Sequence, residues 1–319
     1  WTFPHTEIID MCIGIISNSV SLIPLVYQLA AVRLQVVVFF SPGKDSFRND
    51  QVLSFLDKMQ INYTIEKDRH VDVYTWIKKK QIDACFVIGY SFLLDTHRLG
   101  SLSSSVFNIH FGSLPEYKGP NPVFWQLKHG VENIGICIHL LTDKFDDGPV
   151  VWRKQVPNKD YYNCEFVNQY LSSLCVEGAL FILNLLASHI PVIGENGDLK
   201  QKCYYHQPVL NDILIQWETM SAKEICNLVR ACNPWNKGAI TCYKGQELKL
   251  MDVIIDDSGD NQTYSKALPG EIVQDDNVLK IHTSDNFNLI INMVFYSECF
   301  IPAYYCKYYG LIKGAKIGL

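Results

Sequence analysis

The sequence predicts an α/β fold: a Rossmann-like, mostly parallel sheet with helices on both faces, followed by a small OB-like β-barrel domain. Two patterns support this prediction. In the first half of the chain, short continuous apolar segments alternate with segments of helical spacing, which is typical of parallel strands buried on both faces. In the second half, short alternating segments follow one another between turn residues, which is typical of a small barrel. A length of 319 residues is sufficient for two such domains.

The first domain is predicted to span residues 1–190 and to hold the parallel sheet. Its continuous apolar segments are dense in Val, Ile and Phe, as buried strands are. Strands are predicted at 11–17, 35–40, 62–65, 84–88 and 135–140, with a strand end at 106–107. Helices are predicted at 19–32, 50–59, 71–80 and 164–188. Because such sheets bind ligands at the carboxyl ends of their strands, the residues that follow 84–88 and 106–107 are the first candidates for a site.

Residues 191–206 are predicted to form a linker, because Pro191, Gly194 and Gly197 fall close together there. The second domain is predicted to span residues 207–319. Its helix at 221–232 is expected to begin with a capping box, in which the Ser and Glu side chains bond each other's backbone N–H groups. Strands of the barrel are predicted at 239–243, 248–255, 271–273, 279–283 and 287–293.

An apolar share of 48% and a charged share of 19% are those of an ordinary globular protein. The net charge of −5 gives no general electrostatic attraction to nucleic acid or to an anionic membrane. Residues 22–40 are nearly long enough to cross a bilayer, but Pro24, Gln28, Arg33 and Gln35 interrupt them. A helix followed by a buried strand is predicted there instead, and no membrane partner is expected.

The eleven cysteines include no C-x-x-C pair, and no secretory signal precedes them in this sequence. They are predicted to be free, buried thiols in a reducing compartment, which favours a cytoplasmic protein. Cys226 and Cys232 are six residues apart, unlike the cysteines of a zinc knuckle. No metal cofactor is expected.

A side-chain amide and an imidazole lie two residues apart in the segment NIHFGSLPEYKG at 108–119, and a carboxylate follows in TDKFDDGPVV at 142–151. Asn108 supplies N–H donors that never titrate, and His110 can donate or exchange a proton near neutral pH. Asp146 can orient the imidazole and raise its basicity. Each residue alone would more often serve a turn or a core contact, so it is their joint order that indicates a catalytic site.

The order N-I-H, L-P-x-Y-x-G, a strand and D-x-G-P-V resembles that of the folate-dependent formyltransferases, without a gap from 106 to 156. The segments N-P-W at 233–235 and L-P-G at 268–270 resemble the carboxy-terminal domain of methionyl-tRNA formyltransferases and some sugar formyltransferases. The resemblance covers most of residues 11–319. It implies an N-formyltransferase that uses 10-formyltetrahydrofolate as its formyl donor.

The resemblance implies that Asn108, His110 and Asp146 are the catalytic residues. Asp146 is preferred to Asp147 because the aspartate of the family lies two residues before the glycine of D-x-G. The resemblance also implies a folate pocket. Its lining residues would be Gly89, Tyr90, Phe92, Leu94, Leu141 and Thr142.

Three further positions near the motifs have expected roles. Asp143 matches an acidic position that is structural or contacts the pterin, and His139 is expected to be a hydrogen-bonded structural residue. Gly112 departs from the Ser-Leu-Leu-Pro pattern of relatives. It is expected to remove a side chain beside the folate or the acceptor.

Three classes of acceptor amine compete: methionyl-tRNA, a nucleotide-linked amino sugar, and an amino acid or other amine metabolite. A tRNA-binding enzyme should display basic surface for phosphates. Residues 204–319 hold ten Lys or Arg and thirteen Asp or Glu, a balance of −3, and residues 1–203 have a balance of −2. The loop at 41–50 is short, and its two basic residues are matched by two acidic ones. These counts argue against tRNA, and the nucleotide-linked amino sugar is preferred.

Aromatic side chains near the motifs, Tyr117, Phe124 and Trp125, could stack on a base or a sugar, and core packing is an equal alternative. The second domain is expected to restrict access to the site or to contribute to a homodimer. The alternative to an enzyme is a folate-binding protein that has lost its activity.

Overall fold

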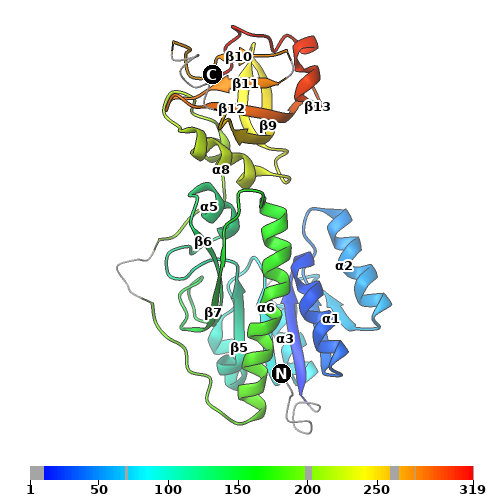
Figure 1. Ribbon diagram of the computed structural model, residues 1–319. Helices are drawn as coiled ribbons and strands as arrows, with labels where there is room; N and C mark the ends of the chain where they lie inside the picture. The colour runs from blue at the N-terminus through cyan, green and yellow to red at the C-terminus, as the bar shows by residue number, and fades with distance from the viewer. Residues whose placement is uncertain (1–10, 69–70, 198–202, 259–265, 277, 319) are drawn as a thin grey trace. The chain divides into compact units, whose positions relative to one another are not determined.

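The computed structural model describes residues 11–68, 71–197, 203–258, 266–276 and 278–318 (Figure 1). By the density of its internal contacts, the chain separates into two compact units. The first unit comprises Trp1–Pro122, Ile134–Val156 and Asn168–Tyr205. The second comprises Val123–Asn133, Pro157–Val167 and His206–Leu319, so each unit is assembled from three stretches of chain.

The first unit is built on a seven-stranded sheet with the order β3-β2-β1-β4-β5-β6-β7. β1 pairs in parallel with β2 and β4, β2 with β3, and β4 with β5, whereas β5 and β6 are antiparallel. The strands are β1 (Cys12–Ser17), β2 (Gln35–Phe40), β3 (Asn62–Ile65), β4 (Ala84–Ile88), β5 (Val106–His110), β6 (Asn133–Leu140) and β7 (Val150–Pro157). This mostly parallel sheet confirms the predicted α/β fold.

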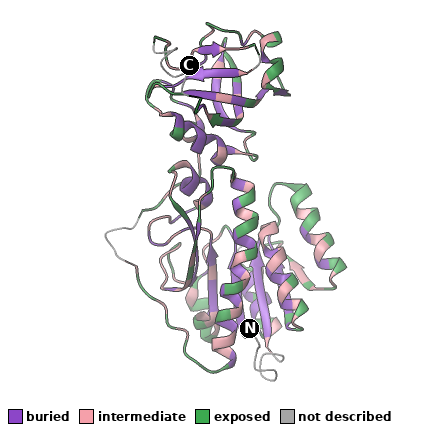
Figure 2. Ribbon diagram, in the orientation of Figure 1, coloured by how far each residue is buried: buried purple, intermediate pink, exposed green. Residues whose placement is uncertain are grey.

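Helices and short 3₁₀ turns connect these strands. They are η1 (Val20–Leu22), α1 (Ile23–Ala31), α2 (Ser46–Lys58), α3 (Asp72–Lys80), α4 (Thr96–Leu99), η2 (Gly100–Ser105), α5 (Pro122–Lys128) and α6 (Cys164–Ala187). The central strands β1 and β4 are buried along their whole length, as strands covered on both faces are (Figure 2). The apolar run at 22–40 is a helix followed by a strand, as predicted.

Helix α6 is long and apolar enough, by length and composition alone, to cross a membrane. In the structure it packs against the sheet. A Cβ added at Gly178 would lie 2.5 Å from the Trp152 ring of β7 and 2.8 Å from Ile138 of β6. The backbone of α6 therefore approaches both strands closely, and Gly178 permits this approach because it has no side chain.

The second unit contains a curled, antiparallel sheet with the order β10-β11-β12-β9-β8, to which β13 is added beside β12. Its strands are β8 (Ala239–Tyr243), β9 (Gln246–Ile255), β10 (Ile272–Gln274), β11 (Leu279–His282), β12 (Asn288–Tyr296) and β13 (Cys299–Pro302). Two helices and a 3₁₀ turn accompany it: α7 (Leu210–Ile213), α8 (Ala222–Cys232) and η5 (Ala303–Tyr309). The sheet is a half-barrel, in line with the small β domain that the sequence predicts.

The capping box predicted at the start of α8 is present. The Glu224 N–H donates to Ser221 Oγ at 3.3 Å, and the Ser221 N–H donates to Glu224 Oε2 at 2.7 Å. The eleven cysteines are free thiols, and eight of them are buried. Burial raises the pKa of the Cys226 thiol to about 11, so this thiol is held in its unreactive, protonated form.

Candidate functional site

The site is built at the carboxyl end of β5. Asn108 and His110 are alternate residues of this strand, so their side chains leave the same face of the sheet. Asp146 lies in the loop between β6 and β7, in the left-handed backbone region at φ +50°. This loop folds back tightly on β6, because a Cβ at Gly148 would lie only 1.7 Å from the Leu140 carbonyl oxygen. A glycine two residues after the aspartate therefore lets the loop bring the carboxylate to β5.

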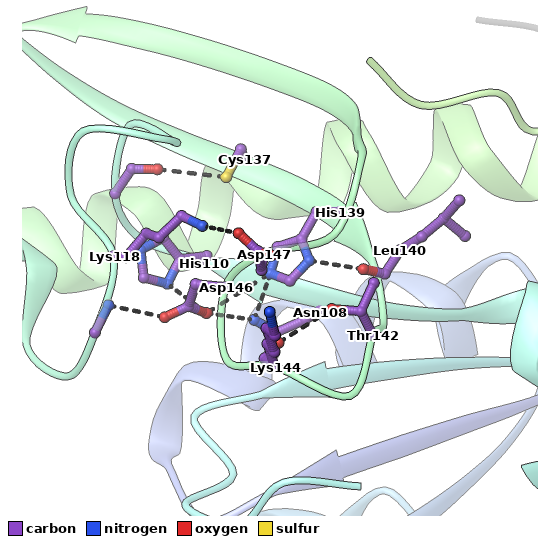
Figure 3. Close-up of polar contacts among 12 residues, drawn as sticks. Asn108, His110, Lys118, Cys137, His139, Leu140, Thr142, Lys144, Asp146 and Asp147 are labelled. Atoms are coloured by element: carbon purple, nitrogen blue, oxygen red, sulfur yellow. Dashed lines mark hydrogen bonds and ion pairs between the residues drawn. The ribbon is translucent and has the colours of Figure 1, made fainter. Parts of the chain in front are cut away.

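The Asp146 carboxylate is the centre of the polar cluster (Figure 3). Its Oδ1 lies 3.4 Å from His110 Nδ1 and accepts a hydrogen bond from Asn108 Nδ2, also at 3.4 Å. Its Oδ2 accepts from the Gly119 N–H at 2.9 Å. Burial by itself would raise the pKa of Asp146, but the facing His110, the neighbouring His139 and the Gly119 N–H together more than offset burial and lower the pKa to about 2. The three predicted catalytic residues are thus brought together around a buried anion.

The His110 ring is held at both nitrogens. Nε2 lies 2.6 Å from the Tyr117 carbonyl oxygen, which can only accept, so this contact requires a proton on Nε2. Nδ1 faces Asp146. With Nε2 carrying a proton, Nδ1 is the nitrogen at which the ring can take up or give back a second proton, and the Asp146 carboxylate faces it. The imidazole therefore has one orientation and a carboxylate ready to stabilise its positive charge.

His139 of β6 holds the Asn108 amide. The two residues are paired in the register of β5 and β6. His139 Nδ1 lies 2.8 Å from the Leu140 carbonyl oxygen and must donate to it, which leaves Nε2 to accept from Asn108 Nδ2 at 3.0 Å. These assignments follow from the hydrogen-bond network. One Asn108 N–H is thereby fixed on His139, and the other is directed at Asp146 in the longer contact.

The two neighbouring aspartates have other partners. Asp147 forms an ion pair with the buried Lys118. Asp143 accepts from the backbone N–H of Thr96 at 3.2 Å and from its hydroxyl at 2.6 Å, and these hydrogen bonds lower the pKa of Asp143. Of the three acidic residues in this loop, Asp146 is the one directed at His110. Lys118 was not singled out in the sequence, although it stands between Tyr117 and Gly119 of the motif.

Gly112 lies behind the contact between His110 and Tyr117. A Cβ at this position would be 2.7 Å from His110 Nε2, 2.9 Å from the Tyr117 oxygen and 2.8 Å from Pro122. The absence of a side chain at Gly112 thus permits the His110–Tyr117 hydrogen bond. The sequence predicts only that Gly112 leaves space beside a ligand and does not indicate this contact.

Four of the six predicted folate-pocket residues share one apolar cluster. Tyr90 and Leu94 are buried in it, and the partly buried Phe92 and Leu141 pack against it. The Tyr90 and Phe92 rings meet edge to face at 5.5 Å, and the Tyr90 hydroxyl donates to Glu66 at 2.7 Å. The cluster combines apolar surface with a few polar groups, as small-molecule sites do.

The other two predicted pocket residues lie outside this cluster. Gly89, at φ +70°, forms the turn after β4, close to Asn18 and Ser19. The Thr142 hydroxyl donates to the Lys144 carbonyl oxygen at 3.1 Å.

The aromatic residues considered for stacking have partners in the protein. Phe124 and Trp125 are buried and meet edge to face at 5.0 Å, which favours core packing. Tyr117 stacks on Tyr205 at 5.4 Å. Within the part of the chain that the structure describes, no group of three or more His, Cys, Asp or Glu side chains is arranged to hold a metal ion.

The low pKa of Asp146 predicts a pH-dependent contribution to stability. Because the folded-state pKa of about 2 lies below the usual 3.8, the ionised carboxylate stabilises the fold by about 2 kcal/mol above pH 4, and this contribution is lost as the pH falls towards 2. The free energy of unfolding can be measured in urea for the wild type and for Asp146→Asn. The difference between the two proteins should be about 1 kcal/mol smaller at pH 3 than at pH 5. A difference that stays constant over this range would contradict the assignment.

Curated proteins similar to this chain include methionyl-tRNA formyltransferases. The enzyme of Thermodesulfovibrio yellowstonii is 25% identical over 215 residues, which are 67% of this chain and 66% of the relative. That of Microcystis aeruginosa is 29% identical over 180 residues, 56% of this chain and 54% of the relative. The chain thus spans between about half and two thirds of the length of these relatives.

Solved structures with the same fold include sugar formyltransferases. The sugar 3N-formyltransferase WlaRD has a TM-score of 0.67 at 16% identity, covering 88% of this chain and 97% of that one. The N-formyltransferase of Helicobacter canadensis has a TM-score of 0.66 at 16% identity, covering 88% and 98%. HypX from Aquifex aeolicus has a TM-score of 0.64 at 17% identity, covering 95% of this chain and 48% of that one.

Two family models match consecutive parts of the chain. The formyl transferase model matches residues 31–177, a range that contains Asn108, His110 and Asp146. The model of the formyl transferase C-terminal domain matches residues 210–297, within the second compact unit. The two matches occur in the order that the sequence motifs predict, and together they cover most of the chain. The chain belongs to the formyl transferase family.

Proposed function

We propose that this chain is an N-formyltransferase that moves the formyl group of 10-formyltetrahydrofolate to a primary amine. The observation that carries the proposal is the convergence of Asn108, His110 and a buried, ionised Asp146 at the carboxyl end of β5. Ligands of parallel sheets bind at this end of the strands. The cluster contains an amide donor, an oriented imidazole and a carboxylate, which are the groups that transfer of an acyl group to an amine requires.

The reaction has two bond changes. The amine nitrogen attacks the formyl carbon, and negative charge develops on the former carbonyl oxygen. The bond between the formyl carbon and N10 of the folate then breaks, and the proton lost by the amine is delivered to N10. In the reacting complex, the Asn108 N–H of the longer, 3.4 Å contact with Asp146 is redirected to the developing charge. His110 takes the proton from the amine and gives it to N10, and Asp146 stabilises the imidazolium while it carries that proton.

The folate is proposed to lie across the strand ends, between the Gly89 turn and the loop that leads to Asp146. The partly buried Phe92 and Leu141, which pack against the core cluster of Tyr90 and Leu94, support this placement, because a pterin ring needs apolar surface beside polar groups. Among the solved structures of this fold, HypX was determined with tetrahydrofolic acid, and WlaRD with dTDP and 5-N-formyl-THF. Those ligands belong to the two similar proteins, and the placement proposed for this chain rests on its own residues.

The acceptor is proposed to be a nucleotide-linked amino sugar. Residues 204–319 have a charge balance of −3, and the short loop at 41–50 offers little basic surface, since Arg48 pairs with Asp45 at 3.5 Å. The Helicobacter canadensis enzyme of the same fold was determined with dTDP-3-aminofucose. Methionyl-tRNA is the second candidate, because the relatives at 25–29% identity are methionyl-tRNA formyltransferases. The free, mostly buried thiols favour a cytoplasmic enzyme.

Substitution of the central pair should abolish most activity. His110→Ala removes the proton-handling group and Asp146→Asn removes the charge that stabilises it, so each should lower kcat by about 10²-fold or more. Asp143→Asn is the matched control, because this residue lies in the same loop but bonds Thr96, and it should change kcat by less than about threefold. Circular dichroism would verify that all three variants are folded. Near-wild-type turnover in either site variant would remove that residue from the mechanism.

Mass spectrometry can identify the acceptor. The enzyme would be incubated with 10-formyltetrahydrofolate and, separately, nucleotide-linked amino sugars, amino acids and methionyl-tRNA. We expect the gain of one formyl group on an amino sugar and none on the tRNA. Formylation of methionyl-tRNA that weakens steeply with added salt would reverse the choice of acceptor and leave formyl transfer intact. Folate binding without formylation of any amine would indicate an inactive folate-binding protein instead.

A further inference from the structure

A short connector segment, Cys203–Tyr205, runs beside the loop Tyr117–Gly119. The Lys118 N–H donates to the Cys203 carbonyl oxygen at 3.1 Å, and the Tyr205 N–H donates to the Lys118 carbonyl oxygen at 2.9 Å. The two segments therefore pair like parallel strands, with Lys118 opposite Tyr204. All of these residues belong to the first compact unit.

Two stacked rings and a glycine also contribute to the contact between the connector and the loop. The Tyr117 and Tyr205 rings stack, with centroids 5.4 Å apart and planes inclined by 17°. Gly119 has a φ of +99°, and a Cβ there would lie 2.1 Å from the Tyr205 carbonyl oxygen. Only a glycine can adopt this backbone conformation and allow the connector to approach so closely.

The loop that the connector holds is also the loop that holds the catalytic cluster. The Tyr117 carbonyl oxygen faces His110 Nε2 at 2.6 Å, and the Gly119 N–H donates to Asp146 Oδ2 at 2.9 Å. Between them, Lys118 forms the ion pair with Asp147. Tyr117 and Lys118 thus each contact one polar group of the site on one side and the connector on the other, and Gly119 bonds Asp146 and lies close to the Tyr205 backbone.

We propose that the connector segment is a positioning part of the active site, and that Tyr205 is its principal positioning residue. This inference rests on the proposed formyltransferase function. The Tyr205 ring stacks on Tyr117, so it acts through the loop by fixing the distance between the His110 ring and the Asp146 carboxylate. A displacement of about 1 Å in such a group can lower the rate by about 10²-fold.

The kinetic test uses the full chain. Tyr205→Ala removes the ring that fixes Tyr117, so kcat should fall by about tenfold or more, whereas KM for folate and acceptor should change by less than about threefold. Tyr205→Phe keeps the stacked ring and should restore kcat to within about twofold. Tyr27→Ala is the matched control, because it removes a ring of the same size from α1, outside the connector and the loop, and that residue is 55% exposed.

Nuclear magnetic resonance of histidine-labelled protein gives a second readout that does not depend on turnover. The N–H that His110 donates to Tyr117 should give a downfield proton signal, which His110→Ala would identify by its loss. In Tyr205→Ala this signal should shift or broaden, and in Tyr27→Ala it should remain unchanged. If Tyr205→Ala does not fold, Tyr205→Leu keeps an apolar side chain without the planar ring and should show the same shift.

The two readouts separate the possible failures. A wild-type protein that formylates no amine would refute the proposed function, and the His110 signal would still decide the connector's role. An unchanged His110 signal in the folded Tyr205 variant would overturn the inference, as would a displaced signal with wild-type kcat. A displaced signal together with reduced kcat, rescued by Tyr205→Phe, would establish it.

Discussion

The largely buried charge of Asp146 is the constraint on which the structure at the carboxyl end of β5 depends. An isolated carboxylate taken out of water costs several kcal/mol, so it persists only where other groups donate to it. Here the donors come from separate parts of the chain: Asn108 and His110 from β5, and the Gly119 N–H from the following loop. Each of these parts must be in place before the anion is stable, which makes the geometry of the candidate site a condition of the fold at this end of the sheet.

Much of the fold could be predicted from the sequence. Strands β2, β3 and β4 have the predicted limits. For β2 and β4 the reason is that strands buried in a parallel sheet are continuous apolar segments, whereas β3 lies at the edge of the sheet and is partly exposed. Helix α2 begins at Ser46, earlier than predicted, because the Asp45 side chain caps it by accepting from the Arg48 N–H. Strand β13 was missed, because three of its four residues are exposed and give no alternation.

The trio of Asn108, His110 and Asp146 could be proposed from the sequence because its motifs come in the order of those in the formyltransferases, which the chain resembles. Asn108 and His110 share a face at a spacing of two residues, and the glycine of D-x-G indicates which aspartate the loop presents. The contacts of Lys118, Gly112 and Tyr205 could not be predicted in this way. These contacts join segments that are distant in the sequence, and the close packing of one backbone on another leaves no periodic pattern of residues.

The interleaving of the two compact units determines how this gene can be divided. The second unit requires Val123–Asn133 and Pro157–Val167 as well as the carboxy-terminal stretch. Within it, Arg230 of α8 donates to Asn158 and to the carbonyl oxygens of Lys159 and Tyr162, and the Cys164 N–H donates to Asn233. A fragment that began at residue 206 would leave this half-buried guanidinium without those acceptors. A second unit separated at residue 206 would therefore lose hydrogen bonds that it has in the whole chain, and its two inner stretches would have to be supplied with it.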